Sequence, residues 1–219
     1  MRFAFFDLDD TLVDTTTALR AWSDDFVAEY GLAENGDTPA SVVQDRVRGV
    51  NTWKEFAENA EDWYGITTPP QELLERIAEA YPKKFSLDPA VADGLTRLRD
   101  AGWRLGIITN GTTIVQQAKI DQAGLRAYVD VAIDSEAAGF KKPDRRIFEL
   151  AAEKLGVDLG PNGWMVGDIL EKDIEGGLTA GLRTIWLPLG RPLPQFGPRP
   201  ERTAASIVEA IDLVAASRG

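Results

Sequence analysis

The sequence predicts an α/β protein, in which helices cover both faces of a parallel sheet and a helical insert follows the first strand. Three features support this fold class. The apolar run Phe3–Phe6 has the length of a buried strand. From Thr15 to about Lys84 the apolar residues follow helical spacing, and no convincing strand interrupts them. After Asp88, strand-like and helix-like segments alternate, which is typical of a parallel sheet.

The first strand is predicted over residues 2–7, and the helical insert begins soon after it. Within the insert, apolar residues recur at the spacing of one helix face, as in Leu19, Trp22 and Phe26. Prolines divide the insert into short helices, because each one interrupts helical hydrogen bonding. They stand at Pro39, Pro69, Pro70, Pro82 and Pro89.

The remaining elements alternate along the chain. Helices are predicted over 89–101, 113–123, 143–155, 172–180 and 203–216. Strands are predicted over 104–108, 129–133, 164–166 and 184–187. A loop rich in proline and glycine, 188–200, precedes the last helix. Nothing in the sequence decides whether this loop is a plain surface loop or part of an interface.

Composition limits the partners of the chain. The 219 residues are 44% hydrophobic and 27% charged, which is ordinary for a globular protein. A net charge of −11 disfavours binding to a nucleic acid polymer. No apolar run approaches the roughly 20 residues that span a bilayer, so no membrane partner is expected. The N-terminus lacks a signal-peptide pattern, which makes the cytoplasm the expected compartment. The oligomeric state is not indicated.

The chain contains no Cys and no His, and this restricts its chemistry. Thiol nucleophiles, thiolate metal sites and imidazole acid–base catalysis are excluded. If the protein is an enzyme, proton transfer falls mainly to Asp and Glu, with Lys or Tyr as alternatives. The metals that suit such a chain are those that prefer oxygen ligands, and Mg²⁺ is the first choice among them.

Two acids, Asp7 and Asp9, follow the first predicted strand. Residues two apart on an extended chain point the same way, so their carboxylates lie close together. Crowded carboxylates cost free energy unless a cation offsets them or one is protonated. Ligands in open α/β sheets bind beyond the carboxyl ends of the strands, where these acids are expected. The segment therefore predicts metal binding, acid–base chemistry, or both.

Polar residues also follow the later strands. Thr109 and Asn110 precede a helix, and they either cap it or help to bind an anion. Lys142 stands just before a predicted helix start, where a cation is unfavourable unless it faces an anion. Asp168 follows Gly167 at a strand end, and Asp173 comes five residues later. Asp173 is equally well explained as a helix-start acid or as a metal ligand, whereas Asp168 stands too far ahead of the helix to cap it.

These four segments resemble, in order, the motifs of the haloacid dehalogenase-like superfamily of hydrolases. They are Asp7–Leu12 (DxDxT), Thr109-Asn110, Lys142-Pro143, and Gly167-Asp168 with Asp173. The likeness covers nearly the whole chain. It implies a Rossmann-like catalytic core over residues 1–14 and 86–219, and a substrate-selecting helical cap over 15–85. The chain keeps Asp9, which the dehalogenase branch lacks, and this implies phosphoryl transfer.

The resemblance also implies roles for individual residues. Asp7 would be the nucleophile, and Asp9 the general acid and base. Mg²⁺ would be bound by Asp7, the Asp9 backbone carbonyl, Asp168 and, directly or through water, Asp173. Thr109, the backbone N–H of Asn110, and Lys142 would bind the phosphate, and Lys142 would also stabilise charge on the nucleophile.

Candidate substrate contacts on the cap are the side chains of Arg46, Arg48 and Trp53, with Asn51 and Lys54 near them. Each has an ordinary structural explanation, because Arg and Lys on a helix usually face solvent and a Trp is usually part of a core.

The expected function is a Mg²⁺-dependent phosphatase that hydrolyses a small phosphorylated metabolite, a nucleoside monophosphate or a sugar phosphate, through an aspartyl-phosphate. A phosphomutase would use the same residues but return the phosphoryl group to the substrate. A non-catalytic phospho-aspartate signalling domain is a third interpretation, which the helical insert disfavours.

Overall fold

The computed structural model describes residues 1–49 and 52–217, and the chain divides into two compact units. The first unit comprises Met1–Val13, Leu87–Asn110 and Gly124–Gly219. The second comprises Asp14–Ser86 and Gly111–Ala123. The second unit thus contains the predicted helical insert together with one helix from a later part of the chain. The division of function between a catalytic core and a cap remains a prediction.

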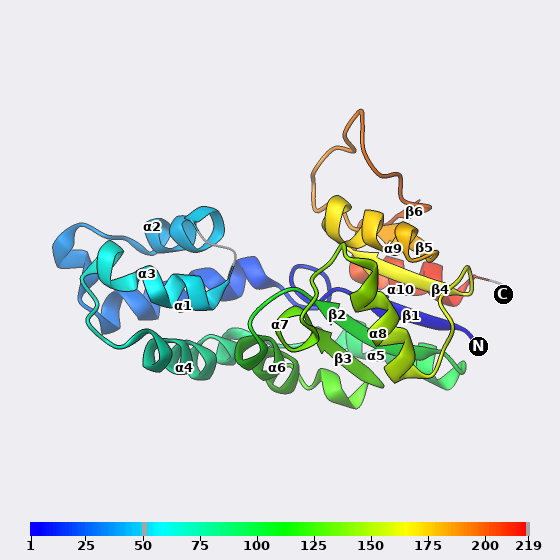
Figure 1. The fold of residues 1–219 in the computed structure, drawn as a ribbon, viewed down its shortest axis with the longest axis horizontal. Helices are drawn as coiled ribbons and strands as arrows, with labels where there is room; N and C mark the ends of the chain where they lie inside the picture. The colour runs from blue at the N-terminus through cyan, green and yellow to red at the C-terminus, as the bar shows by residue number, and fades with distance from the viewer. Residues whose placement is uncertain (50–51, 218–219) are drawn as a thin grey trace. The chain divides into compact units, whose positions relative to one another are not determined.

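The first unit is built on parallel strands in the order β3-β2-β1-β4-β5-β6 (Figure 1). The strands are Phe3–Phe6 (β1), Arg104–Thr109 (β2), Val131–Asp134 (β3), Gly163–Gly167 (β4), Arg183–Trp186 (β5) and Arg202–Thr203 (β6). The predicted doubly wound α/β fold is therefore confirmed. The exception is β6, which replaces the predicted start of the last helix. Its two residues are too few to show a strand pattern in the sequence.

β1 lies in the middle of this sheet because its residues are apolar on both sides. All four of them, Phe3–Phe6, are fully buried. Phe6 is paired with Ile107 of β2 on one side and with Val166 of β4 on the other. The carboxyl ends of these three strands therefore lie next to one another at one edge of the sheet.

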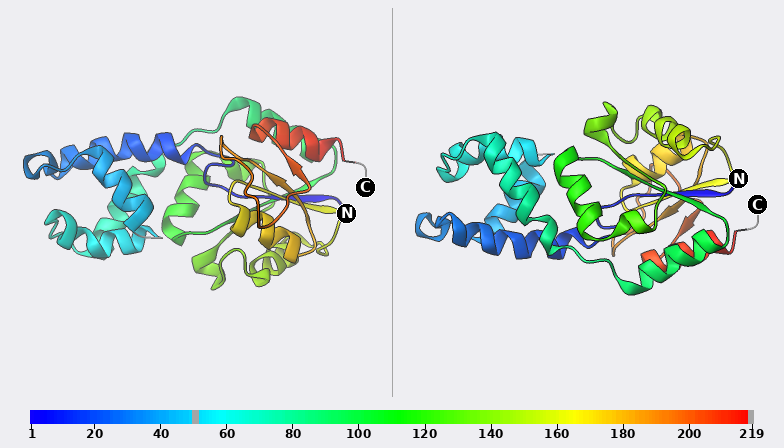
Figure 2. Two further views of the ribbon diagram at one scale, coloured as in Figure 1. Left: turned by 90° about the horizontal axis from the view of Figure 1, so that it is seen from above. Right: turned by 90° about the horizontal axis from the view of Figure 1, so that it is seen from below.

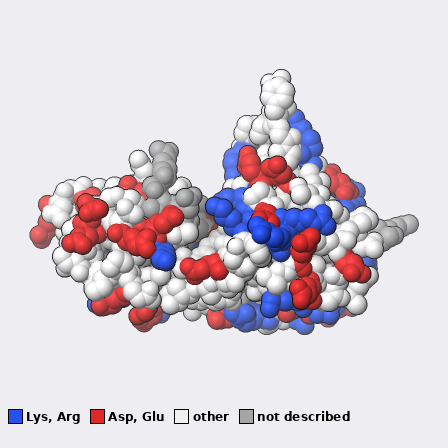
Figure 3. All heavy atoms as spheres, in the orientation of Figure 1, with Lys and Arg blue, Asp and Glu red and all other residues white. Residues whose placement is uncertain are grey.

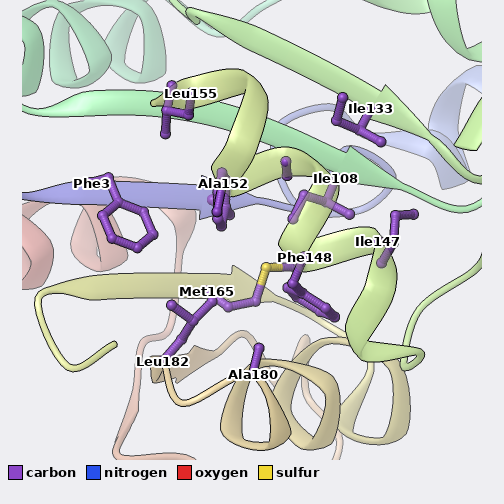
Figure 4. Close-up of a cluster of buried hydrophobic side chains, with 12 residues drawn as sticks. Phe3, Ile108, Ile133, Ile147, Phe148, Ala152, Leu155, Met165, Ala180 and Leu182 are labelled. Carbon is purple, nitrogen blue, oxygen red and sulfur yellow. The ribbon is translucent and has the colours of Figure 1, made fainter. Parts of the chain in front are cut away.

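Helices cover both faces of the sheet, as Figure 2 shows. α5 (Pro89–Asp100) and α10 (Ile207–Ala215) pack together on one face, while α8 (Arg145–Leu155) and α9 (Glu175–Thr179) cover the other. The apolar side of α8 contributes Ile147 and Phe148 to a buried cluster with Phe3 and Met165 of the sheet (Figure 4). Burial of this cluster holds the strands and the helix in a fixed relation.

Some element boundaries differ from the predicted ones. α8 begins at Arg145 and not at Pro143, because the Asp144 carboxylate accepts a hydrogen bond from the Arg146 N–H and caps the helix. Pro143 lies in the turn that precedes Asp144, and the Lys142–Pro143 peptide bond is cis. The helix predicted over 172–180 begins earlier, as a π-helical turn over Leu170–Ile174 that continues into α9. α7 (Ser135–Ala138) and a 3-10 turn (Leu125–Ala127) complete the unit.

In the described residues of the second unit, the regular secondary structure is helical. Its helices are α1 (Thr15–Glu29), α2 (Pro39–Gln44), α3 (Trp53–Tyr64), α4 (Pro70–Ala80) and α6 (Thr113–Gln122), with 3-10 turns at Leu32–Asn35 and Pro82–Lys84 and a π-helical turn at Asp45–Gly49. Its core is aromatic, and the Trp22 ring contacts those of Phe26, Trp53, Phe56 and Tyr81. Across the described parts of the chain, no helix combines the length and the apolar character needed to cross a membrane.

Candidate active site

Three predicted site residues lie at the carboxyl edge of the sheet, on neighbouring strands. Asp7 follows β1, Thr109 is the last residue of β2, and Asp168 follows Gly167 at the end of β4. The Asp7 N–H donates a 2.9 Å hydrogen bond to the carbonyl oxygen of Val166, which continues the pairing of β1 with β4. Each side chain is almost fully buried. The strand order thus gathers residues that are far apart in the sequence.

Lys142 joins two of the acids. Its Nζ donates a 2.6 Å hydrogen bond to Asp7 Oδ1 and another of 2.6 Å to Asp173 Oδ1. The Lys142 side chain is only 2% exposed. Burial alone would lower the pKa of Lys142, but the charges of Asp173 and Asp7 outweigh burial and raise it. Lys142 is therefore a buried cation shared between two carboxylates.

Asp7, Asp168 and Asp173 form a buried acidic triad. One carboxylate oxygen of each residue lies within 4.8 Å of those of the other two. Burial is the largest influence on the pKa of Asp7 and raises it; Lys142 opposes this effect, and Asp173 and Asp9 reinforce it. Burial and the charge of Asp173 raise the pKa of Asp168 to about 6, although Arg191 acts against the shift.

The donor atoms of the acidic triad suit a divalent cation. All three are carboxylate oxygens, which are the ligands that Mg²⁺ and Ca²⁺ prefer. Lys142 and Arg191 contribute two positive charges to three acids, so the cluster keeps an excess of negative charge that a divalent ion would offset. The residues present therefore fit a magnesium site.

Gly167 is required by the position of Asp173. A Cβ atom at Gly167 would lie 2.3 Å from Asp173 Cγ, far inside contact distance. The Ile169 N–H donates a 2.9 Å hydrogen bond to Asp173 Oδ2, which fixes the second oxygen of that carboxylate. The π-helical turn that follows β4 places the Asp173 carboxylate against Gly167. The absence of a side chain at Gly167 leaves the space for this carboxylate.

Asn110 positions the lysine. Its side-chain oxygen accepts a 2.8 Å hydrogen bond from the Lys142 N–H, and its side-chain amide donates one of 3.0 Å to the Lys142 carbonyl. The sequence predicts a backbone role for Asn110, and the structure adds this contact of its side chain. It links residues that are 32 apart in the chain, so no local pattern could have shown it.

Asp9 lies in a tight turn directly after the strand. It forms a bridge with Val13, and the Asp10 N–H donates a 2.9 Å hydrogen bond to the Val13 carbonyl. Asp10 has a φ of 54°, a left-handed conformation that Asp adopts more readily than most residues. Asp9 itself is partly exposed, unlike the acids of the triad. The turn therefore carries Asp9 past the end of β1 and leaves its surface partly open.

Arg191 is a site residue that the sequence did not suggest. Its guanidinium donates hydrogen bonds to the Asp168 carbonyl and, at 3.0 Å, to Asp168 Oδ2. It lies in the proline-rich loop 188–200, where an arginine carries no recognisable signal. This loop therefore reaches the acidic triad.

The cap candidates lie in the second unit. Trp53 is 3% exposed, and its ring contacts Trp22 and Tyr81, as expected for a core residue. The Arg46 guanidinium stacks 4.5 Å from the centre of the Trp53 ring. Lys54 is exposed. The side chain of Arg48, and Asn51 as a whole, lie outside the described residues. Their role as substrate contacts stays a prediction.

Comparison with known proteins assigns the chain to a single protein family. The sequence model of the haloacid dehalogenase-like hydrolases matches residues 1–181. The chain is 31% identical over 217 residues to pyrimidine 5'-nucleotidase YjjG of Escherichia coli, with 96% of each chain covered. It is 30% identical to the glyceraldehyde 3-phosphate phosphatase of Pyrococcus abyssi, covering 87% of this chain and 83% of the relative. The crystal structure of a HAD phosphatase from Thermococcus onnurineus covers 100% of both chains at 25% identity, with a TM-score of 0.73.

Proposed function

The chain belongs to the haloacid dehalogenase-like hydrolases and is a phosphoric monoester hydrolase of that family, and we propose that it works with Mg²⁺ through a phosphorylated Asp7. The observation that supports this most strongly is the contact of Lys142 Nζ with Asp7 and Asp173 inside the buried acidic triad. In that arrangement the Asp7 carboxylate, which would be the nucleophile, lies close to a cation and two further acids.

Asp7 is suited to nucleophilic attack. One oxygen is held by Lys142, which fixes the orientation of the carboxylate, and the other oxygen would attack the phosphate ester. In the first step, a carboxylate oxygen of Asp7 bonds to phosphorus and the ester P–O bond breaks. Water then attacks the phosphorus, the bond to Asp7 breaks, and inorganic phosphate leaves. A covalent intermediate divides one difficult displacement into two easier ones.

Asp9 would transfer the protons. In the first step it gives its proton to the leaving alkoxide, and in the second it accepts a proton from the attacking water. Its place in the partly exposed turn after β1 supports this role, because both leaving alcohol and incoming water need access to it. General acid–base transfer of this kind typically contributes about 10²–10⁴-fold in rate.

The phosphoryl oxygens need positive or hydrogen-bonding partners. Thr109 at the end of β2 and the backbone N–H of Asn110 would donate to them, while Lys142 would offset their charge. Asp7, Asp168 and Asp173 would hold Mg²⁺, with the Asp9 carbonyl, and the ion would supply the positive charge that lets a phosphate dianion approach three carboxylates. The Asn110 side chain would keep Lys142 in place during both steps.

We propose a small phosphorylated metabolite as substrate, either a nucleoside monophosphate or a sugar phosphate. The names of two relatives, a pyrimidine 5'-nucleotidase and a glyceraldehyde 3-phosphate phosphatase, support this class. The choice within it can be made by measuring phosphate release from a panel of nucleotides, sugar phosphates and short phospho-acids with Mg²⁺ present. A phosphomutase would instead give an isomerised substrate with little free phosphate.

The mechanism is tested by replacing the nucleophile. We expect the purified protein to hydrolyse a generic aryl phosphate in Mg²⁺, and Asp7→Asn to lose this activity because an amide cannot displace the ester. Asp158→Asn is the matched control, since Asp158 is exposed and lies outside the site. Full activity of Asp7→Asn, or of the wild-type protein in excess chelator, would contradict the mechanism.

A further inference from the structure

Asp168 is held in place by the last residue of β5 and by the segment that follows this strand. Its backbone carbonyl accepts a 2.8 Å hydrogen bond from Trp186 Nε1 and a second one from the Arg191 guanidinium. The same guanidinium donates to Asp168 Oδ2 at 3.0 Å. Arg191 therefore contacts both the main chain and the side chain of one residue of the acidic triad.

The other two acids have buried donors of their own. Asp7 accepts from Lys142, and Asp173 accepts from Lys142 and from the Ile169 N–H. The Asp168 carboxylate accepts its hydrogen bond from the Arg191 guanidinium. A planar guanidinium suits this task, because its fork of N–H groups can bond two acceptors in a fixed geometry.

Contacts within the loop 188–200 hold the Arg191 side chain in place. Arg191 Nε donates a 2.9 Å hydrogen bond to the Pro188 carbonyl, which fixes the side chain against its own turn. Arg191 also lines a cavity of about 190 Å³ together with Asp168, Trp186, Pro192 and Pro194. Prolines restrict the backbone of this segment, so less conformational freedom is lost when the arginine is held in place.

We propose that Arg191 is a positioning residue for metal binding: it holds the Asp168 carboxylate in the orientation in which it converges with Asp7 and Asp173. This inference rests on the magnesium site of the proposed function. It assigns the proline-rich loop 188–200 a part in building that site from outside the four sequence motifs.

Two opposite effects of Arg191 on metal affinity have to be compared. Its positive charge repels a nearby cation, whereas its hydrogen bonds orient a ligand of that cation. The Arg191 side chain is 45% exposed, so water and salt screen the repulsion. Loss of a hydrogen-bonding partner of a metal ligand typically weakens binding about 10–100-fold. The orienting effect is therefore the larger one.

The test is titration of the metal-free protein with Mg²⁺ by calorimetry, without substrate. We expect Arg191→Ala to bind Mg²⁺ at least about tenfold more weakly than the wild-type protein. Arg191→Lys keeps the positive charge but loses the paired N–H groups of the guanidinium. Its Mg²⁺ affinity should therefore lie between those of the wild-type protein and Arg191→Ala. Arg199→Ala is the matched control, because the Arg199 guanidinium in the same loop donates to the carbonyls of Pro194 and Gln195 and, among the described residues, to none of the acidic triad.

The outcomes separate this inference from the proposed function. Unchanged or tighter Mg²⁺ binding by Arg191→Ala would overturn the role of Arg191 while leaving the magnesium site intact. No binding by the wild-type protein would overturn the site itself. The thermal midpoint of each metal-free variant is measured alongside. If Arg191 acted only by keeping the loop ordered, Arg199→Ala would lower the Mg²⁺ affinity as much as Arg191→Ala does. This result too would overturn the inference.

Discussion

The buried lysine is the residue on which the site depends most. Lys142 is surrounded by protein and contacts two carboxylates at 2.6 Å each. Taking an ion from water into a protein interior costs several kcal/mol, and only close opposite charges repay this cost. The three groups therefore stabilise one another, and removal of the lysine leaves two buried acids without their shared cation.

We expect Lys142→Met to destabilise the metal-free protein by about 3–5 kcal/mol, because Asp7 and Asp173 would remain buried without a counter-charge. Phosphatase activity should be lost as well. Urea unfolding in chelator measures the first effect. Lys141→Met is the matched control, since Lys141 is the adjacent lysine and is exposed. It should change stability by less than about 0.5 kcal/mol. Equal stability of the two variants would show that the buried contacts contribute nothing.

At the scale of elements, the site depends on where each strand stops and how the chain leaves it. β4 ends at Gly167, and the π-helical turn over Leu170–Ile174 then returns Asp173 toward the strand end. On the face of the molecule drawn in Figure 3, Lys and Arg side chains gather in a patch over the region where α8 begins. Lys141 and Arg146 line an open cavity of about 570 Å³ there, whereas Lys142 between them points inward.

The close approach of Asp173 to the end of β4 can be tested by substitution of Gly167. We expect Gly167→Ala to cost about 1–3 kcal/mol of stability, because the new Cβ would overlap the Asp173 carboxylate. Displacement of that carboxylate should also weaken Mg²⁺ binding. Gly160→Ala is the control, since a Cβ there would meet no atom within 4 Å. Thermal unfolding and Mg²⁺ titration of both variants make the comparison, and a Gly167→Ala protein with normal metal affinity would contradict this account of the turn.

At the scale of the whole molecule, the buried acids oppose the stability of a protein that already carries a net charge of −11. The pKa of Asp168 rises from 3.8 to about 6 in the folded state, so the folded protein binds its proton more tightly than the unfolded chain does. The resulting stability is fully present below pH 3.8 and is lost as the pH rises through about 6. The raised pKa of Asp7 acts in the same direction.

We therefore expect the free energy of unfolding of the metal-free protein to fall by about 1–3 kcal/mol between roughly pH 4 and pH 7. Mg²⁺ binds the ionised acids, so a saturating concentration should reduce or reverse this fall. Urea unfolding across this pH range, with and without Mg²⁺, makes the measurement. Asp168→Asn should flatten the metal-free curve, because an amide does not titrate. A metal-free stability that rises with pH over this interval would contradict the cause assigned here.

Much of the molecule could be predicted from local patterns. The apolar run Phe3–Phe6 indicates a buried strand, and the alternation after Asp88 indicates a parallel sheet. The acids and polar residues at the strand ends could be recognised from their position alone. A helix boundary that is set by a cap differs from the predicted one: Asp144 caps α8, so the helix begins at Arg145, two residues after the predicted start at Pro143.

The sequence by itself determined which chemical groups stand at the ends of the strands, because that depends on short runs of neighbouring residues. Only the tertiary structure decided which of them meet. Lys142 reaches Asp7 across 135 positions, Asn110 reaches Lys142 across 32, and Arg191 reaches Asp168 across 23. These contacts follow from the strand order β3-β2-β1-β4-β5-β6, which is set by how the apolar faces of distant segments are buried together.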